Sequence, residues 1–272
     1  VKVKAMKNTA AELLDLWEKY DGNSEKILEE HVDLGYLYAL SKARENLLEW
    51  FPFQPGKKIL VDGADCGSLA GLFLQKGLEV TVLDDSADQL AFTKTRWPKA
   101  ACIQGRLSGS LEALKGRTGK VDYICIAGSL EEEEEARNRQ IKNARKLLAP
   151  GGYLFVAADN PSGLKHWAGA PKEANAIGRK RLKKLLEKGQ KDQRGELTMY
   201  YPFPDHKLPT EIYSDSWLPE KGDLSGAVIS YDYPEFLKAE TGPSYDMICE
   251  EGSFREFSNS FLAVWRKGGW EE

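Results

Sequence analysis

The chain has 272 residues and a formal net charge of −4 at pH 7. This length is enough to bury a substantial core in one α/β domain, and the acidic balance gives no electrostatic case for nucleic-acid binding. Four cysteines lack the spacing of metal ligands, so we expect free thiols in a reducing compartment and no metal site. No apolar run is long enough to span a membrane, and we expect a cytoplasmic protein.

Two helices are predicted ahead of the first strand. Residues 10–20 place Leu13, Leu14 and Trp17 on one side of an amphipathic helix. A second helix is predicted over residues 41–50, with Ser41 as its N-cap. We assign residues 1–53 to an N-terminal helical segment.

A glycine turn follows the first predicted strand. The run Asp62-Gly63-Ala64-Asp65-Cys66-Gly67 separates an apolar strand from an apolar helix over 69–74. In open α/β sheets, ligands bind at the carboxyl ends of strands at such corners, and glycine allows the backbone to approach them closely. The spacing is neither GxGxxG nor a P-loop, so the turn alone is a weak signal.

The second predicted strand strengthens this interpretation. Residues 79–83 are apolar and end in Asp84 and Asp85, about 20 residues after the turn, where nucleotide-binding folds place an acid on the ribose hydroxyls. A carboxylate suits this task because it accepts hydrogen bonds from both hydroxyls. We therefore prefer ribose binding for Asp84, whereas for Asp85 a solvated turn acid is the better interpretation.

The same alternation continues to residue 160. Strands are predicted at 101–103, 121–126 and 153–156, with helices between them, which favours a doubly wound parallel sheet over 54–160. In residues 161–272 we expect a helix over 173–188, a strand over 196–203 and a last strand over 257–265. Residues 202–222 are rich in proline and predict ordered irregular structure or a lid.

This order of elements, with the Leu148-Ala149-Pro150-Gly151-Gly152 turn before the fifth strand, resembles the class I S-adenosylmethionine (SAM) dependent methyltransferases. The resemblance implies a Rossmann-like seven-stranded sheet with SAM as cofactor and the last strand inserted antiparallel. A closer resemblance, to a bacterial group of these enzymes found with glycosyltransferases of surface-polysaccharide synthesis, extends over nearly the whole chain. It is carried by residues 36–41, 44–53, 163–171, 200–205, 211–215 and 257–261.

The resemblance also implies the cofactor-binding residues. Gly63 and Gly67 would shape the loop under the amino-acid part of SAM, and the loops at 105–106 and 127–130 would border the adenine and the methyl donor. The segment before the first strand would reach over the cofactor. The full candidate set is Tyr36, Tyr38, Arg44, Gly63, Asp65, Gly67, Asp84, Asp85, Gly105, Arg106, Gly128 and Ser129.

The glycine turn departs from the family pattern at two positions. Val61 stands where an acid is common, and Asp65 stands where a glycine is common. The Asp65 carboxylate could pair with the ammonium of SAM, or it could narrow the pocket. Arg44 could pair with the carboxylate of SAM or with an internal acid. Asp62 should point to the opposite side of the strand from Val61, because side chains alternate.

Transfer to a hydroxyl group needs a base, and the candidate catalytic residues are His166, His206 and Asp205. His166 follows the fifth strand, near the methyl end of the cofactor in this fold class. A lone histidine is more often a surface or hydrogen-bonded residue than a base. The aromatic residues at 200–203 could form a wall for a sugar or could be core packing. The basic run 179–184 is more often a solvated helix face than a site for an anionic substrate.

The resemblance to the polysaccharide-associated group implies O-methylation of a sugar or glycan precursor. A small metabolite or a peptide remains open as the acceptor. A non-catalytic SAM-binding domain is the alternative from another class, because Val61 and Asp65 alter the glycine turn and no base is obvious.

Overall fold

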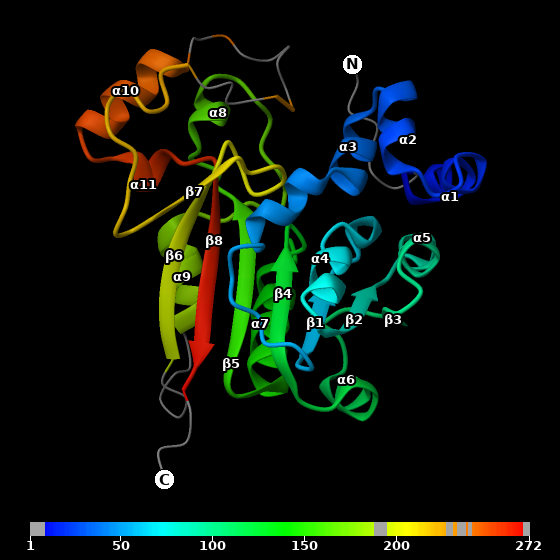
Figure 1. Cartoon of the computed structure of the whole chain (residues 1–272). Coiled ribbons are helices and arrows are strands. Elements are labelled where there is room, and N and C mark those ends of the chain that lie inside the picture. Colours follow the sequence, from blue (N-terminus) through cyan, green and yellow to red (C-terminus); the bar gives the residue numbers. More distant parts are fainter. Residues whose placement is uncertain (1–8, 188–194, 227–230, 233–237, 239–240, 269–272) are drawn as a thin grey trace.

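The computed structural model describes residues 9–187, 195–226, 231–232, 238 and 241–268. One mixed sheet of eight strands forms its centre, in the order β3-β2-β1-β4-β5-β8-β6-β7 (Figure 1). The strands are β1 (Lys58–Asp62), β2 (Glu79–Asp84), β3 (Ala101–Gln104), β4 (Val121–Ala127), β5 (Leu148–Asp159), β6 (Gly195–Phe203), β7 (Glu211–Ser214) and β8 (Ser260–Lys267).

Strands β1 to β5 run parallel to one another, which confirms the doubly wound α/β core. Strand β8 runs antiparallel between β5 and β6, as expected for the last strand. The prediction of seven strands is wrong, because residues 211–214 pair with β6 as an eighth strand. Tyr213 lies opposite Tyr201 in this pairing, and both side chains are buried.

The helices cover both faces and one end of the sheet. They are α1 (Thr9–Lys19), α2 (Ser24–Glu30), α3 (Leu34–Leu40), η2 (Lys42–Leu47), η3 (Asp65–Gly67), α4 (Ala70–Gln75), α5 (Ala87–Arg96), α6 (Leu111–Thr118), α7 (Glu134–Leu147), α8 (Leu164–Trp167), α9 (Arg179–Glu187), α10 (Gly242–Glu250) and α11 (Phe254–Phe257). In Figure 1, α1–α3, α8, α10 and α11 lie beyond the end of the sheet at which β4 and β5 finish. No helix in the described part of the chain is long and apolar enough to cross a membrane.

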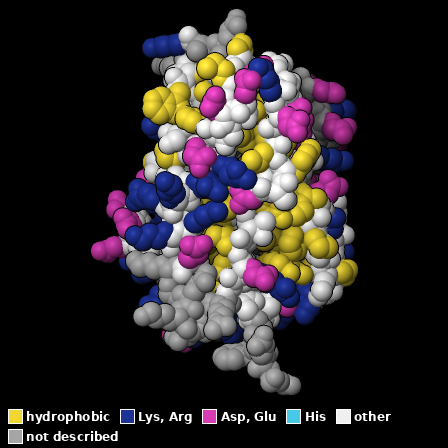
Figure 2. Space-filling view, turned by 90° about the vertical axis from the view of Figure 1, so that its left-hand side faces the viewer, with side chains coloured by type: hydrophobic (Ala, Val, Ile, Leu, Met, Phe, Trp, Pro, Cys, Tyr) yellow, Lys and Arg dark blue, Asp and Glu magenta, His cyan; other side chains and the backbone are white. Residues whose placement is uncertain are grey.

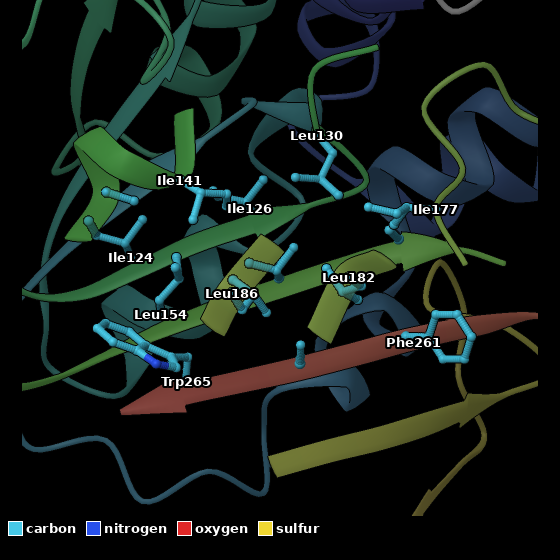
Figure 3. Close-up of a cluster of buried hydrophobic side chains, with 14 of the residues drawn as sticks. Ile124, Ile126, Leu130, Ile141, Leu154, Ile177, Leu182, Leu186, Phe261 and Trp265 are labelled. Carbon is cyan, nitrogen blue, oxygen red and sulfur yellow. The ribbon is translucent and has the colours of Figure 1, made fainter. Parts of the chain in front are cut away.

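Alternation along the strands builds a separate core on each face of the sheet. Leu60, Ile124 and Leu154 face α7 and α9, and Figure 3 shows this cluster with Trp265 of β8 at one end. Ile59 and Val61 alternate with Leu60 along β1 and so point to the opposite face of the sheet. There they pack with α4 and with the aromatic residues of the segment before β1. A third, smaller core joins α1–α3 to Phe92 of α5.

Several predicted boundaries differ from the structure. The segment after Ser41 is the 3-10 helix η2, although Ser41 caps it as expected through its hydroxyl and Ala43 N. Helix α9 begins at Arg179, not at residue 173, because Ile177 N donates to Asp159 O at the end of β5. Residues 254–257 form α11, so the last strand begins only at Ser260.

The predicted irregular lid is only partly irregular. Residues 202–203 belong to β6 and residues 211–214 to β7, so the prediction of irregular structure is wrong for these residues, whereas the role as a lid stays a prediction. The division at residues 53 and 160 stays a prediction; strands from the second and third regions share one sheet.

The basic run of α9 lies on the face drawn in Figure 2, where dark blue side chains gather near the middle. Leu182 and Leu186 are buried beneath it. Arg179, Lys183 and Arg255 surround the Asp215 carboxylate at 3.6, 3.8 and 2.8 Å. Part of this basic run therefore forms a surface ion-pair network.

Phe155 provides a test of the core on the α4 face. Its ring is buried among Phe51, Phe53 and Tyr123. We expect Phe155→Ala to lower the free energy of unfolding by about 3–5 kcal/mol, because it removes a buried ring and leaves a cavity. Urea unfolding measures this value. Met247→Ala, at a side chain that is 67% exposed, is the control and should change it by less than about 0.5 kcal/mol.

Candidate active site

The glycine turn after β1 has left-handed backbone geometry over most of its length. Gly63 and Gly67 have φ values of 96° and 69°, and Asp65 and Cys66 also have positive φ, at 43° and 53°. A β-carbon at position 63 would lie 2.5 Å from Ser129 Cβ, so only glycine fits there. The turn thus brings the end of β1 against the loop after β4.

Asp84 lies beside this turn at the end of β2. Its Oδ2 accepts a hydrogen bond from Ala64 N at 2.8 Å, and its Oδ1 accepts one from Ser86 N at 2.8 Å. Gly105 N donates to the Asp84 carbonyl oxygen at 2.9 Å. The carboxylate is fixed in place and keeps unused lone pairs, as a ribose ligand requires. The neighbouring Asp85 is exposed, in accord with a solvated turn acid.

Arg44 connects the glycine turn to the rest of the site. Its guanidinium is 3.2 Å from Asp65 Oδ2 and donates to the carbonyl oxygens of Ala127, at 3.3 Å, and His206, at 2.5 Å. Ser68 Oγ also donates to Asp65, at 3.0 Å. In this state the partner of Arg44 is therefore an internal acid, one of the two partners that the sequence left open.

Asp62 points away from Val61, as predicted, and anchors a buried polar network on the other face. It accepts hydrogen bonds from Arg106 Nε at 3.2 Å, Leu107 N at 3.2 Å and Gln140 Nε2 at 2.6 Å. Burial raises the pKa of Asp62 in spite of these donors. Arg106 and Gln140 also donate to the carbonyl oxygen of Ser129, so the network fixes the loop after β4.

Arg106 and Ser129 thus have internal partners here. Ser129 Oγ donates to the carbonyl oxygen of Asp62, and Arg106 also pairs with Glu131 at 3.7 Å. Their contact with the cofactor stays a prediction.

A group of charged side chains, all of them buried except the partly exposed Lys207, lies beyond the ends of β4 and β5. We call it the buried charged cluster; it comprises Asp159, Lys165, Asp205, His206, Lys207 and Asp232. Asp159 ends β5, Lys165 lies in α8, and residues 205–207 form the loop after β6. Asn259 joins two of these segments, because it accepts from Lys165 N and donates to the carbonyl oxygen of Pro204, both at 3.0 Å.

His206 occupies the central position of this cluster. A β-carbon at position 128 would lie 3.1 Å from His206 Nε2, so the ring rests against Gly128 at the end of β4. Nδ1 is 3.6 Å from Asp159 Oδ1. Neither ring nitrogen has a hydrogen-bond partner within the described part of the chain, although the ring is buried.

The charges of the cluster follow from burial and proximity. Burial alone would raise the pKa of Asp159, but His206, Lys207 and Lys165 lower it to about 2. Burial lowers the pKa of His206 to about 4. Burial opposes charge on Lys165 and Lys207, yet the nearby carboxylates raise the pKa of both. At neutral pH the cluster holds an ionised Asp159, two ammonium groups and a neutral imidazole.

The other sequence candidates are divided between two places. Tyr38 lies at the cluster, with Lys207 Nζ 5.3 Å from its ring centre and Tyr231 edge-on. Tyr36 instead bonds Glu12 of α1 at 3.0 Å. His166 Nδ1 lies 3.1 Å from the carbonyl oxygen of Ala170, and burial lowers the pKa of His166.

Sequence reasoning missed Asp159, Lys165, Lys207 and Asp232. The first three lie in or beside segments that carried the family resemblance, but only their neighbours were singled out. A charged residue at the end of an apolar strand, as at Asp159, was the available signal. In the described part of the chain, no group of three or more histidine, cysteine, aspartate or glutamate residues could hold a metal ion.

Comparison with known proteins agrees with this geometry. A family described as "Methyltransferase domain" matches residues 63–156, about a third of the chain. No curated protein matches. The domain match indicates SAM as the cofactor, and Asp84 with the glycine turn provides a carboxylate and an open backbone that fit its ribose and amino-acid parts.

Solved structures are similar to the chain in fold. A SAM-dependent methyltransferase from Archaeoglobus fulgidus has a TM-score of 0.55 and 15% identity, with 94% of this chain and 99% of that chain covered. A TehB-like SAM-dependent methyltransferase from Corynebacterium glutamicum has a TM-score of 0.50 and 16% identity, with 92% and 97% covered. At these identities the likeness shows the fold alone.

Asp84 provides a test of the cofactor site. We expect Asp84→Ala to weaken SAM binding by about 1–3 kcal/mol, because buried hydroxyl groups lose a charged partner. Isothermal calorimetry with SAM or S-adenosylhomocysteine measures the change. Asp85→Ala is the matched control and should bind like the wild type. Equal affinity in the two variants would remove Asp84 from the site.

Protonation of His206 should make stability depend on pH. Between its ordinary pKa of 6.5 and about 4, the unfolded chain binds a proton that the folded chain does not. The free energy of unfolding should therefore fall as the pH falls, by about 2–3 kcal/mol between pH 6.5 and 4.5. Asp159, with a pKa of about 2, titrates below this window.

Urea unfolding of wild type and His206→Gln at pH 7, 5.5 and 4.5 tests this dependence. The variant should lose most of the decrease, whereas His31→Gln, on the N-terminal helices, should retain it. If the free energy of unfolding of His206→Gln falls with pH as much as that of the wild type, groups other than His206 cause the decrease.

Proposed function

We propose that this class I methyltransferase domain, whose cofactor is SAM, methylates a hydroxyl group of a sugar or glycan precursor. One observation carries the proposal. The neutral, buried imidazole of His206 rests against Gly128 at the end of β4, and both of its ring nitrogens lack hydrogen-bond partners among the described residues. In an open α/β fold the carboxyl ends of the strands are where ligands bind.

In this proposal His206 is the general base. The sulfonium group of SAM supplies an activated methyl group, so the protein must position the acceptor and remove its proton. His206 Nε2 would accept the proton of the acceptor hydroxyl, and SAM would supply the methyl group to the acceptor oxygen and leave as S-adenosylhomocysteine. Asp159, 3.6 Å from Nδ1, stabilises the imidazolium that results. Arg44 holds the main chain of His206 through its carbonyl oxygen.

The chain's own residues would hold the cofactor around the glycine turn. Asp84 would accept the ribose hydroxyls, and the backbone at Gly63 and Gly67 would lie under the amino-acid part. Arg44 and Asp65 carry charges that match the carboxylate and ammonium groups of SAM, so their mutual ion pair would be exchanged or shared when SAM binds. Tyr38 would reach the acceptor side from the segment before β1.

A non-catalytic SAM-binding domain is the second candidate, and the Arg44–Asp65 pair favours it. Asp65 is occupied by Arg44 and Ser68, and Val61 is buried in the core with no acid to replace it. If Asp65 receives the ammonium of SAM, Asp65→Gly should weaken binding. Tighter binding in Asp65→Gly would mean that the carboxylate obstructs the pocket, and would favour this second candidate.

Methyl transfer to a panel of methyl glycosides and nucleotide sugars tests the proposed reaction. Release of S-adenosylhomocysteine and the mass of the product report transfer. We expect His206→Gln to lower kcat by about 10²–10⁴-fold, the usual contribution of a general base, with SAM affinity unchanged. His31→Gln is the control. SAM binding without transfer to any glycoside would support a small metabolite, a peptide or a non-catalytic role instead.

A further inference from the structure

The buried charged cluster contains carboxylate oxygens with unused capacity to accept hydrogen bonds. Asp159 Oδ1 and Asp205 Oδ2 are both buried, and neither has a partner at hydrogen-bond distance in the described residues. The desolvation of a carboxylate oxygen is costly unless a donor replaces water. A donor from outside the described residues would therefore complete this group.

Lys165 lies between the two oxygens but reaches neither. Its Nζ is 3.8 Å from Asp159 Oδ1 and 3.7 Å from Asp205 Oδ2, beyond hydrogen-bond length, whereas it is 3.0 Å from Asp232 Oδ2. Polar contacts beyond about 3.5 Å commonly hold a bridging hydroxyl or water. Lys165 Nζ thus places the two oxygens close enough for one small molecule to touch both.

The other two carboxylate oxygens of the pair have different surroundings. Asp205 Oδ1 accepts from Lys207 N, Leu208 N and Tyr231 Oη at 2.8, 3.3 and 3.0 Å, and these hydrogen bonds fix the Asp205 carboxyl group. Asp159 Oδ2 has an ion-pair contact, at 3.8 Å, with Lys207 Nζ, which also pairs with Glu173 at 3.3 Å. Among the described residues, Asp159 Oδ1 and Asp205 Oδ2 are therefore buried acceptors without a hydrogen-bond donor.

The balance of charge indicates which donor fits. Around Lys165 and Lys207 stand four acids, Asp159, Asp205, Asp232 and Glu173, so the group is negative overall. A phosphate or carboxylate would add like charge here. An ammonium group would lie close to the Lys165 ammonium. Neutral hydroxyl groups donate to carboxylates without either conflict.

We propose that Asp159 and Asp205 form a subsite for two adjacent hydroxyl groups of a neutral sugar, next to His206. The Lys165 ammonium attracts both carboxyl groups and holds their oxygens near each other. One hydroxyl of the pair donates to Asp159 Oδ1 beside the His206 ring, and the other donates to Asp205 Oδ2. This inference rests on the proposed function, and it narrows the acceptor to a ring with a neutral vicinal diol.

Saturation-transfer NMR and calorimetry with the S-adenosylhomocysteine-loaded protein test the subsite directly. The probes are the methyl glycosides of mannose, rhamnose, glucose and galactose, their monodeoxy derivatives, methyl glucuronide and methyl glucosaminide. We expect at least one neutral glycoside to bind, and removal of one hydroxyl of its diol to weaken binding at least about tenfold. This arm uses the wild-type protein and so does not depend on the folding of a variant.

Asp159→Asn and Asp205→Asn should each weaken binding of the same glycoside at least about tenfold, because an amide oxygen accepts a hydrogen bond more weakly than a carboxylate oxygen does. Asp215→Asn, in the surface network of α9, is the control and should leave binding unchanged. Thermal unfolding of each variant reports whether it is folded. In Asp159→Asn, removing the sugar hydroxyl that donates to Asp159 should weaken binding little further. The substitution and the removal of the hydroxyl each eliminate the same hydrogen bond.

The proposal is overturned if no neutral glycoside binds, if the glucuronide or the glucosaminide binds more tightly than every neutral glycoside, or if folded Asp159→Asn and Asp205→Asn bind as the wild type does. Its failure is distinct from failure of the proposed function. Transfer to a sugar with unchanged KM in both variants overturns the subsite alone, whereas diol binding without methyl transfer overturns the reaction alone.

Discussion

The buried guanidinium of Arg44 is the contact on which the arrangement of the site depends. It touches the glycine turn through Asp65, the end of β4 through Ala127 and the loop after β6 through His206. A buried charge is tolerated only where partners replace its water, and here the partners come from three segments far apart in sequence. One side chain thereby holds both the glycine turn and the loop that carries His206.

Burying several charged groups together is energetically unfavourable. In this chain the buried charges lie in two separate polar groups. On one face, Asp62 is satisfied by Arg106, Gln140 and Leu107 N, and this group fixes loops. Beyond the ends of β4 and β5, Asp159, Asp205 and His206 keep atoms without partners among the described residues. A fully satisfied network rigidifies a fold, whereas one with unused acceptors is a place where a ligand completes the bonding. The Asp62 network therefore has a structural role, and the buried charged cluster is the candidate binding site.

The altered glycine turn also contains one residue that packs in the core and one that organises loops. In the resembled family an acid is common at position 61, but here the acid is at position 62 and faces the other side of the sheet. Alternation explains the consequence: Val61 enters the core beside α4, while Asp62 organises the loops after β3 and β4. Asp65, the other acid of the turn, pairs with Arg44.

Local periodicity, strand alternation and turn chemistry are enough to predict the parallel core, the glycine corner, Asp84 at the end of β2, the direction of Asp62 and the Ser41 cap. The same sequence patterns also indicate His206, Asp205 and Arg44 as candidates. Contacts between distant segments, in contrast, establish that β7 joins the sheet, that α9 begins at Arg179, and that Asp159 and Lys165 meet residues 205–207. Those outcomes depend on hydrogen bonds and ion pairs between segments separated by many residues, and no local pattern in the chain encodes them.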